Sequence, residues 1–339
     1  MAWQRRHGRH DLPWQGTRDP YRVWLSEIML QQTQVGTVIP YYERFLARFP
    51  GLESLARAPL DDVLRIWAGL GYYSRARNLH RAAREVCADH GGAFPRGRAG
   101  LESLPGIGRS TAAAIAALAF GAREAILDGN VKRVLARHFA VSGFPGNAAV
   151  EKRLWALAES LVPARSAGTY AQALMDLGAT VCTRAAPVCT QCPLHSTCAA
   201  LAAGRVSAYP ASRPARKVPL RSVAMLLVMR DDRVLLEKRP PAGIWGGLWS
   251  FPEMPVEDNI RAHCAAKLGC EVGKPCALAP FRHGFTHFTL DIQPYRCEVR
   301  RLRPRAEESA RAWFSPEQAQ EAGVPAPIRK LLAGLRTDA

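Results

Sequence analysis

Long hydrophobic runs are absent from this sequence. Its most apolar stretch, residues 111–120, is far shorter than the roughly 20 apolar residues that a membrane-spanning helix needs. The N-terminal segment, residues 1–10, is basic and polar and lacks the apolar core of a secretory signal peptide. These absences predict a cytoplasmic protein that has no membrane partner.

Acidic residues are few relative to basic ones. The 339-residue chain has 29 Asp and Glu against 46 Lys and Arg, which gives a net charge of +17 and a pI of about 10.0. This balance is typical of proteins that bind nucleic acids, although charge alone does not exclude a basic protein without such a partner. The apolar fraction of 48% excludes bulk disorder, and the length is sufficient for two domains.

A turn followed by a helix is predicted just before the alanine-rich run. Pro105 and Gly106 mark a tight turn, and Gly108 is a second position without a side chain. Ser110 or Thr111 can cap the helix that follows. Backbone N–H groups at such a helix start can approach an anion closely. On this stretch alone, a phosphate-binding hairpin and an ordinary helix–turn–helix corner are both open.

One carboxylate, Glu27, occupies a position that suits acid–base chemistry. Asp19 is a favourable N-cap for a helix predicted over residues 21–32. Glu27 follows Val23 by four residues and Trp24 by three, which places it on or beside the buried face. Burial raises the pKa of a carboxyl group, as a general acid at neutral pH requires. The alternative is a boundary Glu that reaches solvent or an Arg partner.

A second carboxylate, Asp128, precedes Gly129 and a helix predicted over residues 131–139. Asp is a favoured N-cap, so local structure alone can explain it. A catalytic role is compatible with capping, because a capping carboxylate is held rigid and ionised at the helix start.

Other helices are predicted over residues 37–49, 60–67, 75–90 and 110–120. Tyr72, on a glycine-bounded loop, is able to wedge into a base stack or simply to pack. The uncharged residues Gln31, Gln32 and Thr33 suit contacts to DNA, or form a polar helix end. A basic run indicates either a solvated helix face or a phosphate track; its members are Arg75, Arg77, Arg81 and Arg84.

Four cysteines give the most specific signal in the chain. Their spacing is Cys182-x6-Cys189-x2-Cys192-x5-Cys198, which can close a loop around one metal centre. Zinc is the general default for four thiolates, but this spacing is not a standard zinc-finger one. The remaining cysteines, which we expect to be packed or incidental, are Cys87, Cys264, Cys270, Cys276 and Cys297.

The residue pattern changes from one typical of helices to one typical of strands after a proline-containing basic segment. Residues 202–220 predict a linker. Residues 223–228 and 234–236 flank a turn as in a β-hairpin, and residues 288–295 predict another strand. The second domain, residues 221–339, is therefore expected to be α+β.

Five stretches occur in an order that resembles the MutY-type adenine DNA glycosylases, in the helix–hairpin–helix, endonuclease III superfamily. They are Trp24–Val35, Gly69–Tyr73 with Arg75–Leu79, Leu104–Thr111, Ile126–Val131 and the cysteine loop. The resemblance implies an all-α helix–hairpin–helix glycosylase domain over residues 1–201, with a [4Fe–4S] cluster on the loop 182–198. It implies a Nudix-like 8-oxoguanine recognition domain over residues 221–339, after the linker 202–220.

The resemblance also implies a reaction and a partner. The enzyme would remove adenine opposite 8-oxoguanine or guanine in double-stranded DNA, and would be nucleoid-associated if bacterial. A monomer is our default expectation. Glu27 would protonate the flipped adenine at N7, Asp128 would stabilise positive charge on the sugar, and Asn130 would position them. Further contacts to DNA or base are implied for Trp14, Gln31, Gln32, Thr33, Tyr72, Gly106, Gly108 and Ser110.

Ser110 departs from the bifunctional members of the superfamily. Those relatives carry a lysine at this position as the amine nucleophile for strand cleavage. Because serine cannot form a Schiff base, we expect a monofunctional glycosylase that uses water.

The C-terminal domain departs from a Nudix hydrolase. Gly247, Glu253 and Arg261 match the catalytic box, but its metal-binding glutamates are replaced by Ala262, Ala265 and Ala266. The domain is therefore expected to recognise 8-oxoguanine rather than to hydrolyse a nucleotide. The family's Phe-Ser-His loop is here Phe285, Thr286 and His287, and the threonine keeps the hydroxyl.

Three other functions stay open on the sequence. An endonuclease III-like glycosylase/lyase would act on damaged pyrimidines, against which Ser110 argues. A non-catalytic iron–sulfur DNA-binding protein would use Glu27 only structurally. A nucleotide pyrophosphatase would act through residues 221–339, against which the missing glutamates argue.

Overall fold

The computed structural model describes residues 1–214, 218–303 and 310–335. The chain divides into two compact units: Met1–Arg57 with Asn78–Ala215, and Ala58–Arg77 with Arg216–Ala339. Arg216 and Lys217 of the predicted linker lie outside the described residues. In those described, no helix is long and apolar enough to cross a membrane.

The first unit is helical. Its larger helices are α1 (Ala2–His7), α2 (Pro20–Leu30), α3 (Val35–Arg48), α4 (Leu52–Arg57), α6 (Ser74–Asp89), α7 (Arg98–Glu102), α8 (Arg109–Phe120), α9 (Gly129–His138), α10 (Ala148–Ser160) and α11 (Ala167–Thr180). Ser74–Arg77 of α6 are grouped with the second unit. The short elements η1 (Cys189–Gln191), η2 (His195–Thr197), α12 (Ala199–Ala202) and η3 (Val206–Ala208) follow.

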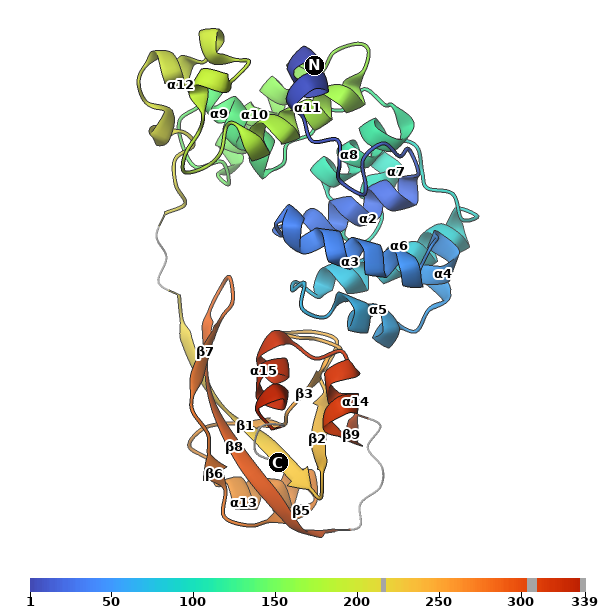
Figure 1. Cartoon of the computed structure of the whole chain (residues 1–339), viewed down its shortest axis with the longest axis vertical. Coiled ribbons are helices and arrows are strands. Elements are labelled where there is room, and N and C mark those ends of the chain that lie inside the picture. The colour runs from blue at the N-terminus through green and yellow to red at the C-terminus, as the bar shows by residue number, and fades with distance from the viewer. Residues whose placement is uncertain (215–217, 304–309, 336–339) are drawn as a thin grey trace. The chain divides into compact units, whose positions relative to one another are not determined.

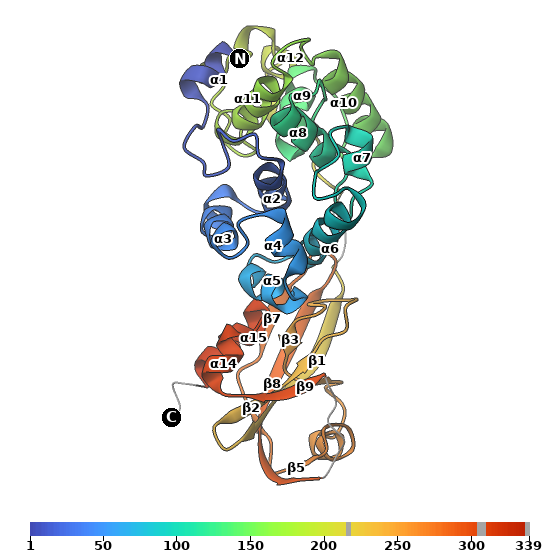
Figure 2. The same cartoon turned by 90° about the vertical axis from the view of Figure 1, so that its right-hand side faces the viewer.

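Helix α2 lies at the centre of this unit, where it packs against α3 and α8 (Figure 2). It begins as predicted, because the Asp19 side chain accepts a hydrogen bond from the Tyr21 N–H at 2.9 Å. Its neighbour α8 is rich in alanine and buried on most sides. Small side chains permit the close approach of helices on which this packing depends. A second core joins α9, α10 and α11 around Val131, Leu154 and Leu174.

The expected caps of α8 are wrong. The helix begins after Gly108, which has no side chain that could cap it. The Ser110 hydroxyl instead accepts the Leu127 N–H at 3.0 Å, and the Thr111 hydroxyl accepts from Gln31 at 3.4 Å. Both side chains are within reach of neighbouring segments and stabilise tertiary contacts.

The basic run is not one solvated face. Arg81 and Arg84 are exposed, but Arg75 is buried. Its guanidinium donates to the carbonyl oxygens of Leu70 and Gly71 at 3.3 and 3.2 Å. The preceding loop turns back over the start of α6, so its carbonyl groups meet this side chain.

The second unit contains α5 (Leu60–Trp67) and a mixed sheet (Figure 1). Its strands are β1 (Leu220–Arg230), β2 (Arg233–Lys238), β3 (Trp249–Ser250), β4 (Glu253–Met254), β5 (Cys270–Val272), β6 (Cys276–Ala277), β7 (Phe281–Gly284), β8 (Thr289–Leu302) and β9 (Arg311–Phe314). The order β3-β2-β1-β8-β5 forms the main path. Central β1 pairs in parallel with β8 and antiparallel with β2, which confirms the hairpin.

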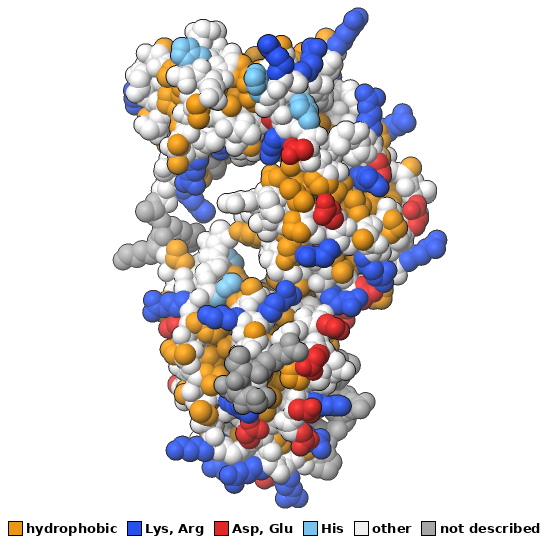
Figure 3. All heavy atoms as spheres, in the orientation of Figure 1, with side chains coloured by type: hydrophobic (Ala, Val, Ile, Leu, Met, Phe, Trp, Pro, Cys, Tyr) orange, Lys and Arg blue, Asp and Glu red, His pale blue; other side chains and the backbone are white. Residues whose placement is uncertain are grey.

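Helices α13 (Ile260–His263), α14 (Pro316–Glu321) and α15 (Ala326–Gly334), with the π-helix η4 (Cys264–Leu268), complete the second unit. Cys264, Cys270 and Cys297 are buried in its core, as expected of packed thiols. Figure 3 shows Lys and Arg side chains over the surface of both units, with fewer Asp and Glu side chains.

Candidate active site

Glu27 on α2 faces a cavity of about 400 Å³ in the first unit. The side chain is half-buried. Burial first, and the charge of nearby Asp128 second, raise the pKa of its carboxyl group to about 7. The position on the edge of an apolar helix face therefore raises the pKa of Glu27, in the direction that the sequence pattern predicts.

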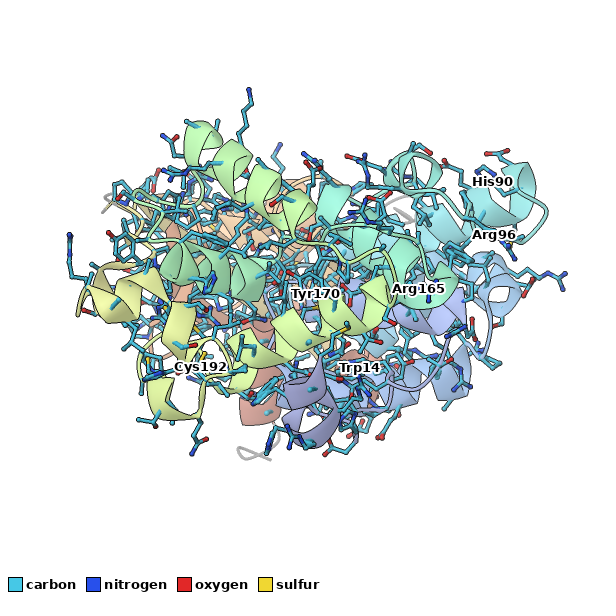
Figure 4. All side chains as sticks on the ribbon, turned by 90° about the horizontal axis from the view of Figure 1, so that it is seen from above. Trp14, His90, Arg96, Arg165, Tyr170 and Cys192 are labelled. Atoms are coloured by element: carbon cyan, nitrogen blue, oxygen red, sulfur yellow. The ribbon has the colours of Figure 1, made fainter. Side chains whose placement is uncertain are left out.

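An N-terminal loop forms one wall of this cavity. Trp14 lies on that loop, before α2, and is labelled in Figure 4. Its ring packs edge-on against Tyr42 with centroids 5.4 Å apart. Asp176 on α11 is fully buried and accepts hydrogen bonds from Arg9 Nε at 2.8 Å and Arg9 N at 3.3 Å. The Asp176–Arg9 pair thus fixes the start of the wall to a helix far away in sequence.

Asp128 caps α9, as predicted, while its carboxylate remains close to Glu27. One oxygen accepts the Val131 N–H at 2.7 Å, and the other accepts Asn130 Nδ2 at 3.2 Å. Burial raises the pKa of Asp128, and these hydrogen bonds together with the charge of Arg133 oppose that rise. The hydrogen bonds hold the carboxylate in place. They also favour its ionised form and so offset part of the effect of burial.

Arg133 connects this carboxylate to the cysteine loop. Its Nη2 donates to Asn130 Oδ1 at 2.9 Å and to Gly178 O at 2.6 Å, and its Nε donates to Cys182 O at 2.7 Å. Because Arg133 occupies the amide oxygen of Asn130, the amide nitrogen is oriented toward Asp128. A Cβ at Gly178 would lie 2.6 Å from the Asn130 Cβ, so α11 must carry glycine here.

The four cysteines of the loop gather after α11, where Cys192 is labelled in Figure 4. Burial raises the pKa of the Cys192 thiol, and charges at Cys182, Cys198 and Cys189 raise it further, so each lies close enough to act on it. All four are free thiols. Within the described residues, no group of three or more His, Cys, Asp or Glu is arranged around a single metal ion.

Arg137 holds the same loop from α9. The residue is 3% exposed. Its guanidinium donates to Thr183 O at 2.6 Å, Arg184 O at 3.1 Å and Tyr209 O at 2.9 Å, and lies 3.4 Å from Cys182 Sγ. Arg137 therefore connects α9 to the cysteine loop and to the segment that follows it.

The predicted tight turn lies between α7 and α8. Gly106 has φ +78°, and a Cβ there would lie 2.7 Å from Asn78 Cβ, so glycine is required. Gly108 faces open space, and the first N–H groups of α8 follow it without partners inside the helix. Gln31 and Thr33 are half-buried after α2, whereas Gln32 is exposed with φ 55°.

In the second unit, Tyr72 lies beside the predicted recognition loop. Tyr72 is 46% exposed, and its hydroxyl oxygen is 3.3 Å from Thr286 Oγ1. Phe285 stacks on Phe288 with ring centroids 4.6 Å apart, while Thr286 and His287 are exposed. The turn between β7 and β8 thus presents a hydroxyl and an imidazole to solvent.

The residues at the positions of the Nudix catalytic box form an ion pair and part of a short helix in the second unit. Glu253 on β4 forms an ion pair with Arg239 at 2.6 Å. Ala262, Ala265 and Ala266 lie on α13 and η4, where they provide no oxygen ligand.

Four residues of the site were not predicted from the sequence. Asp176 and Arg137 meet partners far along the chain, which no local pattern indicates. Arg133 stands three after Asn130 on a predicted helix, and this spacing could have indicated the contact. Gln15 adjoins Trp14, but its place in the lining of the cavity depends on the path of the loop.

Family models match both parts of the chain. The model of the HhH-GPD superfamily of base excision DNA repair proteins matches residues 25–160, and that of the NUDIX domain matches residues 223–334. A solved structure of a thermostable thymine-DNA glycosylase is 34% identical, with a TM-score of 0.52, over 58% of this chain and 91% of its own.

Two curated relatives match nearly the whole chain. An adenine DNA glycosylase of Buchnera aphidicola (subsp. Baizongia pistaciae) is 37% identical over 99% of this chain and 95% of its own length. The human adenine DNA glycosylase is 36% identical over 98% of this chain and 72% of its own length.

Proposed function

Because the chain belongs to the adenine DNA glycosylase family, whose activity is adenine removal in base excision repair, we propose that its substrate is adenine mispaired with 8-oxoguanine or guanine. The observation that carries the proposal is the raised pKa of Glu27 in a cavity beside Asp128. An acid that stays protonated near neutral pH beside a fixed carboxylate matches the needs of N-glycosidic bond hydrolysis.

Glu27 acts as the general acid in this proposal. The adenosine leaves the base stack, because the bond to its sugar is inaccessible inside a duplex. Glu27 donates its proton to N7 of the flipped adenine, which then departs as a neutral base. The resulting carboxylate can accept a proton from the water that attacks the sugar.

Asp128 stabilises the positive charge that develops on the sugar as the bond breaks. For this role it must be ionised and must not move. The hydrogen bonds from Val131 and Asn130 support both conditions. Asn130 is thus a positioning residue, and Trp14 contributes an aromatic wall to the cavity.

DNA contacts of the first unit are assigned to the hairpin between α7 and α8 and to the residues around it. The hairpin with Gly106 and Gly108 would receive phosphate oxygens at the start of α8, helped by the positive end of that helix. Gln31, Gln32, Thr33 and Ser110 border this hairpin in the proposal. The hydroxyl of Ser110 already accepts from Leu127, so its main contribution is to hold the segment before Asp128.

We assign recognition of 8-oxoguanine to Tyr72 with Phe285, Thr286 and His287. The proximity of the Tyr72 and Thr286 hydroxyl groups supports a shared contact to one base. The proposed domains are a glycosylase domain over residues 1–201, a linker over 202–220 and a recognition domain over 221–339. The matched family segments 25–160 and 223–334 support their order, although residues 58–77 are grouped with the second compact unit.

A [4Fe–4S] cluster fits the four cysteines. All four thiols gather at one place, and Arg137 provides positive charge beside Cys182. Cys182, Cys189, Cys192 and Cys198 would hold the cluster. When bound it would supply a cross-link that closes the loop against α9, with no step in base release.

Single-turnover assays test the substrate proposal. Duplexes with adenine opposite 8-oxoguanine, guanine, cytosine or thymine would be compared at enzyme excess. We expect the fastest release opposite 8-oxoguanine and a slower release opposite guanine. Because Ser110 cannot form a Schiff base, borohydride should trap no covalent adduct. Equal rates for all four duplexes would overturn the mispair assignment, and a trapped adduct would overturn the monofunctional one.

The pH dependence of base release provides a second test. With the pKa of Glu27 near 7, the carboxyl group is mostly protonated below that pH, and above it the proton that the reaction needs is lost. We therefore expect the single-turnover rate to decline above about pH 7, by roughly tenfold per unit. On the acid side the rate should decline as Asp128 becomes protonated, at a pH above the usual range of Asp because burial raises its pKa.

The residual rate of Glu27→Gln is the control for this profile, because that variant has no proton to lose at position 27. Its alkaline decline should be absent. A wild-type rate that stays constant well above neutral pH would contradict a titrating acid at this position.

A further inference from the structure

The side-chain amide of Gln15 has an unusual environment. Both its oxygen and its nitrogen are buried, yet neither has a hydrogen-bond partner in the described protein. A buried polar group without a partner destabilises the folded chain, so two such atoms on one amide need an explanation. Gln15 lines the same cavity as Glu27.

The loop that carries Gln15 is held in place. The Gln15 N–H donates to Leu12 O at 2.9 Å, which closes a tight turn, and Gly16 follows with φ +75°. Arg9 is bound to buried Asp176 on one side of the turn, and Asp19 caps α2 on the other. The amide is therefore held in the wall of the cavity by contacts that do not involve its own polar atoms.

Several other polar side chains of the cavity have hydrogen-bond partners. Arg9 Nε donates to Asp176 Oδ1, and Gln172 Nε2 donates to the same oxygen at 3.0 Å. His10 Nε2 lies 3.0 Å from Gln4 O. Among the described residues that line the cavity, Gln15 is the one whose buried side-chain donor and acceptor are both free.

A primary amide offers a donor and an acceptor side by side. Adenine offers the complement, since its exocyclic amine donates and the adjacent ring nitrogen accepts, and glutamine pairs with adenine edges in this way. We propose that the Gln15 amide is a specificity-determining contact for the flipped base: it accepts from the exocyclic amine and donates to N1, the ring nitrogen beside the amine that Glu27 does not use. The assignment rests on the proposed function of the cavity as the adenine site.

This contact adds a role that Glu27 does not supply. Glu27 acts on N7, where proton transfer makes any purine a better leaving group. The Gln15 amide reads the group that distinguishes adenine from a purine without an amine. Activation of the leaving group is thus assigned to Glu27, and recognition of the base as adenine is assigned to Gln15, on another wall of the same cavity.

The test measures the preference for the amine itself. Single-turnover rates would be determined for duplexes with adenine, or with purine that lacks the exocyclic amine, opposite 8-oxoguanine. In Gln15→Met, which keeps the length of the side chain but not its hydrogen bonds, the adenine-to-purine rate ratio should fall about 5- to 100-fold relative to wild type. The intrinsic reactivities of the two bases cancel in this comparison.

A second variant separates the two hydrogen bonds. Gln15→Glu keeps an oxygen that accepts from the amine and loses the donor to the ring nitrogen. It should retain the preference for adenine over purine, with lower rates on both. If Gln15→Met folds poorly, Gln15→Asn withdraws the amide by one methylene and should lose the same preference.

An unchanged adenine-to-purine ratio in Gln15→Met or Gln15→Asn would overturn the inference, while wild-type adenine release would leave the proposed function intact. Failure of the wild-type enzyme to release adenine from any mispair would instead reject the proposed function. The two failures are therefore distinguished within one set of assays.

Discussion

Replacement of Glu27 by Gln should nearly abolish adenine release and leave duplex affinity within a few-fold of wild type. The substitution preserves the size of the side chain and removes its transferable proton. General acid catalysis contributes about 10²- to 10⁴-fold, and a loss in this range is expected in the single-turnover rate opposite 8-oxoguanine. Affinity depends mainly on phosphate contacts elsewhere, so electrophoretic or anisotropy titrations should change little.

Glu43→Gln is the matched control. Glu43 is an exposed carboxylate on α3, so the same chemical change there should leave the rate unaltered. A Glu27→Gln enzyme with near-normal base release would show that another group protonates the base. A parallel loss of DNA binding would indicate a structural role for Glu27 instead.

The second large effect is expected for Arg137→Met, on stability. Methionine can fill part of the buried volume, but the carbonyl oxygens of Thr183, Arg184 and Tyr209 lose their donor. Each acceptor left unsatisfied costs about 1–3 kcal/mol. Because the three acceptors are only partly buried and water can replace some of the lost bonds, we expect a loss near the lower end of their sum, roughly 3–5 kcal/mol in the free energy of unfolding. That is a large part of the roughly 5–15 kcal/mol that stabilises a typical domain.

Urea unfolding followed by circular dichroism measures this loss, and iron content per chain measures occupancy of the cysteine loop. Both should fall in Arg137→Met. Arg153→Met, at an exposed position on α10, should stay within about 0.5 kcal/mol of wild type. Normal stability and iron content in Arg137→Met would show that the loop is held without this side chain.

Local signals in the sequence predicted much of the fold. Asp19 and Asp128 were identified as helix caps because capping depends on a few adjacent residues, and both side chains bond as expected. The β-hairpin of β1 and β2 followed from two apolar runs that flank a turn. The buried stripe of α2 placed Glu27 correctly from helical spacing alone.

Tertiary contacts account for what was missed. Arg75 has the spacing of a solvated residue, and only the return of the preceding loop buries it. Ser110 has the composition of a cap, yet its hydroxyl serves Leu127, which lies 17 residues downstream. Asp176 and Arg9 are separated by 167 residues. The residue pattern of one segment cannot predict which residue so far along the chain will contact it.

The nearness of Glu27 and Asp128 also has a consequence for folding. In the unfolded chain the Glu27 carboxyl has its ordinary pKa, whereas in the folded chain the pKa is about 7. The folded state therefore holds this proton more tightly, and its stability falls as the pH rises from the ordinary range of Glu through about 7. At and above neutral pH the ionised acid opposes folding. The site thus reduces the stability of the domain that builds it, a compromise common where activity needs strained or repelling groups.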